Sequence, residues 1–222
     1  MQGASGGLRR VGPGYGTAKG KISFSKTEII HIAAAIGVLS AAFSIIMRGS
    51  RLDADPTVNI ILIVAVSFML VVFSFLFHEF GHKFVAQRYN AWSEFRAYPY
   101  GLIIALLFAV AAGFLFAAPG AVYIRGNMDK VTYGKISLAG PAVNFVIAAV
   151  AVAALLALEP GTLAYAVLSM LAYLNAFLGL FNMIPVLPFD GAKIVAWSIP
   201  VYLVTAAIGA AELATVWLCF IS

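Results

Sequence analysis

Residues 58–82 read VNIILIVAVSFMLVVFSFLFHEFGH, a long uncharged and mostly apolar stretch that ends at two histidines and a glutamate. About 20 apolar residues are enough for a helix to cross the hydrocarbon core of a bilayer. The stretch 58–77 is therefore predicted to be a transmembrane helix. Ionisable side chains are costly in lipid and are functional candidates by default, so the three at its end, His78, Glu79 and His82, are the first candidates for chemistry.

The composition of the whole chain supports this interpretation. Of its 222 residues, 63% are hydrophobic and 10% are charged, whereas a soluble domain is about 45–50% apolar and about 25% charged. The 14 basic and 9 acidic side chains are too few to solvate a surface around this apolar mass. A soluble domain and a disordered chain are thereby excluded, and the single cysteine, Cys219, excludes a disulfide scaffold.

Further runs without a charged residue are long enough, or nearly so, to cross a bilayer. They are continuous rather than alternating between polar and apolar residues, which indicates helices and not the strands of a β-barrel. We predict an all-α polytopic membrane protein with about five to six transmembrane helices. The further runs are residues 29–47, 97–124, 136–158, 160–189 and 194–211.

The basic residues lie where topology signals are expected. Residues 1–20 are predicted to form a flexible basic cytoplasmic tail, and residues 21–222 a single membrane-embedded domain with its core at 58–191. The net charge of +5 then reports orientation, with the N-terminus in the cytoplasm of a prokaryotic cell, and predicts no binding of nucleic acid. The basic residues of the N-terminal segment are Arg9, Arg10, Lys19, Lys21 and Lys26.

The HEFGH motif at 78–82 has a spacing that suits a metal. Four helical residues advance about 400°, which places both imidazoles on one face about 6 Å apart, as two nitrogen ligands of one Zn²⁺ require. Glu79 lies to the side of the pair, where a carboxylate can exchange a proton with water that zinc has acidified. The alternative is a solvated helix end that marks the membrane interface, because Lys83 and Arg88 follow closely.

A zinc site needs a third protein ligand, and Asp190 is the best placed candidate. It follows the charge-free run 160–189 within NMIPVLPFDG at 182–191, where two prolines disfavour a regular helix and can hold a carboxylate rigidly. The alternative is an ordinary aspartate of a Pro-Gly turn. Other candidates are less well placed: His31 near the start of the first run, Glu159 in a turn, and Glu212 deep in the last run.

A shared metal constrains the topology. The segment 136–158 leads outward and the segment 163–182 returns, so Asp190 lies on the side of the membrane where residue 136 begins. For His82 to lie on that side, the run 97–124 must enter and leave there. We therefore predict a re-entrant or short β segment around 97–124, which could bind an extended substrate by strand addition.

Two classes of function fit an intramembrane cluster of His, Asp and Glu. In a hydrolase Glu79 is the general base, whereas in a membrane transporter or cation carrier the same residues relay protons or bind the transported ion. A carrier is expected to have internal inverted repeats, and none is visible in the sequence. A hydrolase is the preferred hypothesis and a transporter the alternative, while a non-catalytic scaffold is disfavoured by the presence of all the chemical residues.

Three motifs together resemble those of the site-2 proteases, the family of intramembrane zinc metalloproteases. HEFGH at 78–82 resembles the H-E-x-G-H of that family, and the Asn, Pro and Asp-Gly of 182–191 are similar to its second motif. AGPAVNF at 139–145 resembles the start of the intervening helix. The three motifs occur in the family's order and cover the region 58–191.

The resemblance implies a role for each matched residue. His78, His82 and Asp190 would bind zinc, one ion per chain. Glu79 would be the general base, and Asn182 would be the second catalytic residue, in contact with the scissile peptide.

The resemblance also implies an activity. The chain would be a zinc metalloendopeptidase that hydrolyses peptide bonds within or near transmembrane segments of membrane-anchored proteins, in the lipid bilayer, with its active site open to the cytoplasm. Asn144 would shape the site. The sequence departs from the family at Ala192 and Lys193, where Gly and then Arg are common, which affects substrate handling more than zinc binding.

Overall fold

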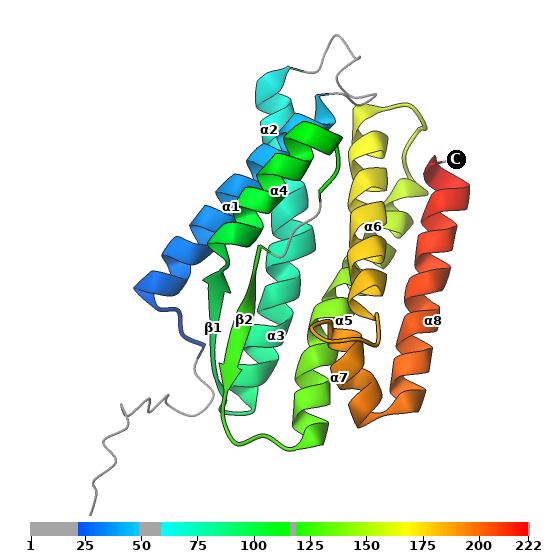
Figure 1. Cartoon of the computed structure of the whole chain (residues 1–222). Coiled ribbons are helices and arrows are strands. Elements are labelled where there is room, and N and C mark those ends of the chain that lie inside the picture. The colour runs from blue at the N-terminus through cyan, green and yellow to red at the C-terminus, as the bar shows by residue number, and fades with distance from the viewer. Residues whose placement is uncertain (1–21, 49–58, 116–118, 222) are drawn as a thin grey trace, which may run out of the picture.

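The computed structural model describes residues 22–48, 59–115 and 119–221, which form a bundle of helices with a small two-stranded sheet (Figure 1). Five of its helices are long and apolar enough to cross a membrane, so the prediction of an all-α polytopic protein is confirmed. The predicted tail, residues 1–20, lies outside the described residues. The helices are α1 (Lys26–Met47), α2 (Ile60–Val71), α3 (Phe77–Arg88), α4 (Pro99–Ala112), α5 (Lys130–Leu155), α6 (Leu163–Asn182), α7 (Asp190–Trp197) and α8 (Ile199–Val216), with π-helical turns η1 (Val72–Leu76) and η2 (Trp217–Ile221).

The long apolar stretch of the sequence forms one continuous helix through α2, η1 and α3, which spans Ile60–Arg88. A turn follows it at Asn90, whose φ of 59° is left-handed. The N–H of Asn90 donates to Gln87 O at 2.9 Å, and the N–H of Ala91 donates to Ala86 O at 3.0 Å. These two bonds satisfy the last carbonyls of α3 and turn the chain into the first strand.

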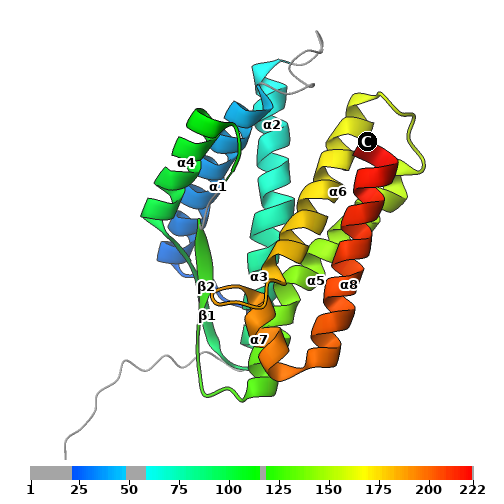
Figure 2. The ribbon, with the colours of Figure 1, turned by 45° about the vertical axis from the view of Figure 1, so that its right-hand side comes forward.

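The run 97–124, predicted to re-enter or to form a short β segment, belongs to a hairpin. Strand β1 (Trp92–Ala97) pairs antiparallel with β2 (Gly120–Arg125), and α4 lies between them in sequence. Because the two strands are antiparallel neighbours, the chain returns to the side from which it left. The prediction of a re-entrant or short β segment is therefore confirmed, and Figure 2 shows α1 and α4 on one side of the long helix and α5, α6 and α8 on the other.

Helix α5 packs against α3, α6, α7 and α8, and so lies at the centre of the second half of the chain. It begins at Lys130, earlier than the predicted residue 136, because the charge-free run marks only the part suited to lipid. Asp129 caps it by accepting a hydrogen bond from the N–H of Thr132 at 2.8 Å. Likewise α1 begins at Lys26 instead of 29, where Ser25 accepts from the N–H of Glu28.

The segment after α6 is irregular, as its two prolines predict, and regular structure resumes at α7. A second break at Ser198 separates α7 from α8, and Pro200 lies in the first turn of α8, where its missing N–H costs nothing. The outer faces of the bundle expose large apolar side chains, such as Ile61 (76% exposed) and Val150 (65%), as lipid contact requires.

Candidate metal centre

Helix α3 presents His78 and His82 on one face. Their side chains are buried, and their Nε2 atoms lie 3.1 Å apart. Gly81 allows this face to approach α5, because a Cβ at that position would lie 2.7 Å from the carbonyl oxygen of Ala139. The H-E-x-x-H spacing therefore places the two imidazoles together against α5, as the sequence predicted.

The hydrogen bonds of the two rings determine which nitrogen is free. The Nδ1–H of His78 donates to Asn144 Oδ1 at 2.6 Å, and the Nδ1–H of His82 donates to the carbonyl oxygen of Ile136 at 2.8 Å. Both partners are oxygens that only accept, because the Asn144 amide nitrogen is itself used to donate to Ser74 O and Asn175 Oδ1. The Nε2 atoms of both neutral rings thus carry lone pairs that point at the same place.

Asp190 supplies a third acceptor at that place. Its Oδ2 lies 3.0 Å from His82 Nε2 and 3.5 Å from His78 Nε2, and its Oδ1 accepts from Lys193 Nζ at 3.0 Å. Gly191 permits the position, since a Cβ there would lie 2.2 Å from Met183 O.

The three acceptors fit a tetrahedral metal. Ligand atoms at about 2.0–2.2 Å from Zn²⁺ lie about 3.3–3.6 Å from one another, and the observed separations are 3.0, 3.1 and 3.5 Å. Converging lone pairs without a proton between them are unfavourable unless a cation joins them. Among the described residues, His78, His82 and Asp190 are the group of His, Cys, Asp and Glu side chains that could hold a metal.

Glu79 lies beside the three acceptors and next to the sheet. It is buried, with 7% of its surface exposed, and its Oε2 accepts from the N–H of Val122 at 2.9 Å. Val122 is in β2, so the hairpin reaches the HEFGH helix at this carboxylate. A carboxylate held here can exchange a proton with a molecule at the metal position.

A cavity of about 450 Å³ opens onto this cluster. Its wall includes Asn182, whose Nδ2 donates to Leu178 O at 3.0 Å, so this predicted catalytic residue lies at the cavity but does not touch the three acceptors. The other candidates lie elsewhere: His31 accepts from the N–H of Ala97, and neither Glu159 nor Glu212 lines the cavity. The predicted site residues that line it are His78, Glu79, His82, Asn182 and Asp190.

Two features of the site differ from the sequence interpretation or go beyond it. Lys83, read as a marker of a solvated interface, is fully buried, so the solvated helix end is wrong at this position. Asn144 binds His78 directly, and Asn175, which the sequence analysis missed, supports it through two bonds, to Asn144 and to Ser74 Oγ. Asn175 could have been recognised because an amide side chain within an apolar helical run is costly unless it forms hydrogen bonds.

Two proteins of Methanocaldococcus jannaschii are similar to this chain. One, named "Putative zinc metalloprotease MJ0611", is 39% identical over 176 residues, which cover 79% of this chain and 86% of that protein. The chain belongs to this family of zinc metalloproteases. The other, "Zinc metalloprotease MJ0392", is 31% identical to the metalloprotease described here over 130 residues, 59% of this chain and 33% of that protein.

No protein-family model matches this metalloprotease, and no solved structure matches it significantly. The membrane-spanning helices and the buried His-His-Asp group belong to the same bundle, which makes it a membrane metalloprotease.

Proposed function

We propose that this metalloprotease is an intramembrane protease of the site-2 type, which hydrolyses peptide bonds within or near transmembrane segments of membrane-anchored proteins. The observation that carries the proposal is the convergence of His78 Nε2, His82 Nε2 and Asp190 Oδ2 within 3.5 Å, beside the Glu79 carboxylate. A cation carrier would use similar ligands, but the names of the relatives favour proteolysis.

The depth of the site supports hydrolysis in the membrane. The continuous helix Ile60–Arg88 has 29 residues, more than a bilayer requires. His78 precedes its end at Arg88 by ten residues, or about 15 Å at 1.5 Å per residue. The acceptor cluster would therefore lie below the membrane surface, within reach of water through the cavity.

The proposed roles follow from position. One Zn²⁺ held by His78, His82 and Asp190 would supply Lewis acidity, which polarises a peptide carbonyl and acidifies water. Glu79 takes a proton from the attacking water on a carboxylate oxygen and delivers it to the nitrogen of the leaving amine. Water and a peptide bond are thereby converted to a carboxylic acid and an amine, and the carboxylate of Glu79 is restored.

Substrate contacts are proposed for the cavity wall. Asn182 lines the cavity, and its Nδ2 donates one hydrogen bond within α6, to Leu178 O. The second N–H and the oxygen of its amide would bind the scissile peptide. Residues 119–124, which include most of β2, line the same cavity. An extended peptide could add to the outer edge of β2 next to Val122, whose N–H binds Glu79, and would be held unwound beside this carboxylate.

The proposed orientation places the site towards the cytoplasm. Helix α3 and strand β2 end, and helix α5 begins, at the same end of the bundle (Figure 1), and each of these three element ends carries a basic residue. The positive-inside rule then assigns this end to the cytoplasm, and the basic residues of the N-terminal segment would place the N-terminus on the same side of the membrane. The described basic residues at this end are Arg88, Arg125, Lys130 and Lys135.

Glu79→Gln tests the proposal in liposomes that contain a model single-span substrate, with zinc content measured alongside cleavage. The substitution keeps shape but removes the base, so we expect zinc to be retained and the cleavage rate to fall about 100-fold or more. Glu159→Gln, on an exposed turn, is the matched control and should cleave normally. Undiminished cleavage by Glu79→Gln, or no cleavage by the unmodified protein, would refute the proposal.

A further inference from the structure

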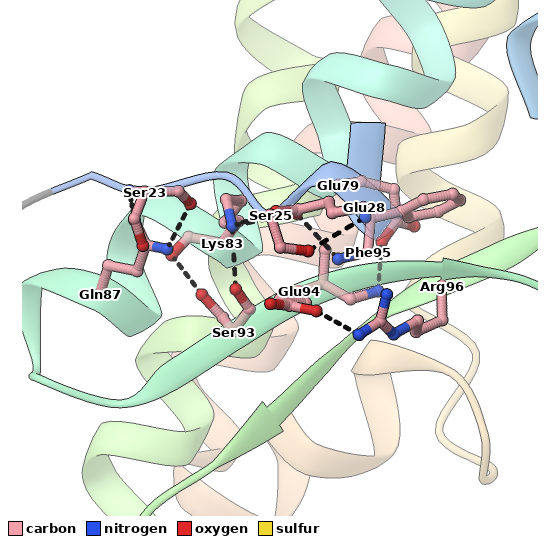
Figure 3. A network of polar contacts seen from close by, with 11 residues as sticks. Ser23, Ser25, Glu28, Glu79, Lys83, Gln87, Ser93, Glu94, Phe95 and Arg96 are labelled. Carbon is pink, nitrogen blue, oxygen red and sulfur yellow. Dashed lines mark hydrogen bonds and ion pairs between the residues drawn. The ribbon is translucent and has the colours of Figure 1, made fainter. Parts of the chain in front are cut away.

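A buried ion pair lies one helical turn beyond Glu79. Lys83 and Glu28 are both 0% exposed, and Lys83 Nζ lies 2.9 Å from each carboxylate oxygen of Glu28 (Figure 3). Replacing such a pair with apolar residues is often neutral or stabilising, so stability alone does not explain it. Lys83 follows His82 in the chain, but neither Lys83 nor Glu28 belongs to the group that could hold a metal or lines the cavity, and the catalytic roles proposed above do not use them.

Each member of the pair also binds the backbone of β1. Lys83 Nζ donates to the carbonyl oxygen of Ser93 at 2.8 Å, and the N–H of Phe95 donates to Glu28 Oε1 at 2.9 Å. The pair therefore occupies the outer edge of β1, where another strand would otherwise pair. Through it, α1 and α3 hold the same three residues of the strand.

The other edge of the hairpin is held by Glu79 in the same way. Phe95 lies directly opposite Val122 in the strand register, and the N–H of Val122 donates to Glu79 Oε2. Glu28 thus accepts from the N–H of Phe95 and Glu79 from the N–H of Val122, two paired residues whose N–H groups face outward from opposite edges of the hairpin. Because the ladder keeps paired strands about 4.8 Å apart, a shift of Phe95 moves Val122 relative to Glu79.

The segment before α1 keeps Glu28 in place. Ser23 exchanges two hydrogen bonds with the Gln87 amide, at 3.2 and 3.3 Å, and the Phe24 ring lies 4.6 Å from Lys83 Nζ. Glu28 itself lies in the first turn of α1, where the helix dipole favours a negative charge. The pair is consequently built into two helices and cannot follow the hairpin if the hairpin moves.

We propose that Glu28 and Lys83 are positioning residues that hold the outer edge of β2, and a peptide lying along it, in register with Glu79. This inference rests on the proposed function, because it specifies how the same site aligns its substrate. Loss of the pair should therefore lower the rate of cleavage and leave the zinc content unchanged. A misplacement of about 1 Å at a reacting centre can lower a rate about 100-fold.

The test uses Glu28→Gln, Lys83→Met and the double variant in the full-length protein, reconstituted with the model substrate. For each, kcat, KM, zinc content and hydrogen exchange of the peptides that cover 92–97 and 119–126 are measured. We expect each single variant to keep its zinc, to lose about 10- to 100-fold in kcat, and to exchange faster in both strands. The double variant has no unpaired buried charge and a Gln oxygen that can still accept from Phe95, so it should regain part of both losses.

Glu94→Gln is the matched control. Glu94 lies in β1, but its partner Arg96 is in the same strand, so the pair does not tie the sheet to a helix. Unchanged kcat in folded single variants would overturn the inference, and so would loss of zinc in step with kcat. If the single variants fail to fold, the double variant decides by itself. Faster exchange in the two strands together with a lower kcat at full zinc content supports the inference, and a wild-type kcat overturns it. Failure of the unmodified protein to cleave would instead refute the proposed function.

Discussion

Gly140→Ala should remove the metal while leaving the fold largely intact. Gly140 lies in α5, where an added Cβ would be 2.3 Å from His82 Nε2 and 2.7 Å from His78 Cε1. The new methyl would therefore occupy the space in front of the nitrogen that is free to bind a metal. No other change in charge or polarity accompanies the substitution, so its effect is steric.

The magnitude follows from these distances. A carbon and a nitrogen in normal contact lie about 3.5 Å apart, so the 2.3 Å approach requires the His82 ring to retreat by about 1 Å. Metal–ligand distances tolerate about 0.2 Å, and His82 would no longer be a ligand. Loss of a supporting contact alone lowers metal affinity about 10- to 100-fold, so displacement of a ligand should cost about 100-fold or more, with about 1–3 kcal/mol of overpacking strain.

The assay is zinc content by mass spectrometry after equilibration at a series of buffered free zinc concentrations, with the melting temperature measured in parallel. Gly37→Ala is the control, because Gly37 lies in α1 with nothing within 4 Å of its added Cβ. It should bind zinc normally and be stabilised by up to about 1 kcal/mol, since Ala favours a helix more than Gly. Wild-type zinc affinity in Gly140→Ala would refute the assignment of His78 and His82 as a shared metal site.

Three further predictions concern the support of the site and the caps. Asn144→Leu removes the acceptor of His78 Nδ1–H and the donor to Asn175 Oδ1, so we expect about 1–3 kcal/mol of destabilisation per unpaired group and about 10- to 100-fold weaker zinc binding, measured by thermal denaturation and zinc titration. Chelation of zinc should lower the melting temperature and readdition should restore it, because the metal binds only the folded state; an unchanged melting temperature would contradict the binding of zinc to the folded protein. Asp129→Ala tests a cap: hydrogen bonds from Thr132 lower the pKa of Asp129 below its ordinary 3.8. The melting-temperature advantage of the wild type should thus be full above about pH 4 and vanish as the pH falls through the lower folded pKa.

The sequence predicted those parts of the site that depend on the spacing of residues within one helix or on the side of the membrane where a segment ends. His78, Glu79 and His82 share one helix, so their spacing alone places them together. The hairpin around 97–124 followed from the requirement that Asp190 and His82 meet on one side. The start of α5 at Lys130 was missed because the prediction depended on charge-free runs, whereas the cap at Asp129 determines where the helix begins.

The supporting polar contacts could not be predicted, because their partners are distant in the sequence. The bonds of Asn144 to His78 and of Asn175 to Ser74 join residues separated by 66 and 101 positions. Lys83 and Glu28 are separated by 55 positions, and each by itself resembles an interfacial charge. Only the packing of α1, α3 and β1 turns them into a buried pair.

One stripe of α5 explains why both histidines present the same nitrogen. Ile136, Gly140 and Asn144 follow one another at intervals of four, so they lie on one face of the helix. The first accepts from His82 Nδ1, the last accepts from His78 Nδ1, and the glycine between them leaves room at Nε2. The metal centre is therefore oriented by α5, whereas the strand edge at Glu79 is held by the pair Glu28–Lys83 on the opposite side. Because the two supports share no side chain, their variants should differ in kind: changes in the α5 stripe should act on zinc affinity, and changes in the pair should act on rate at full zinc occupancy.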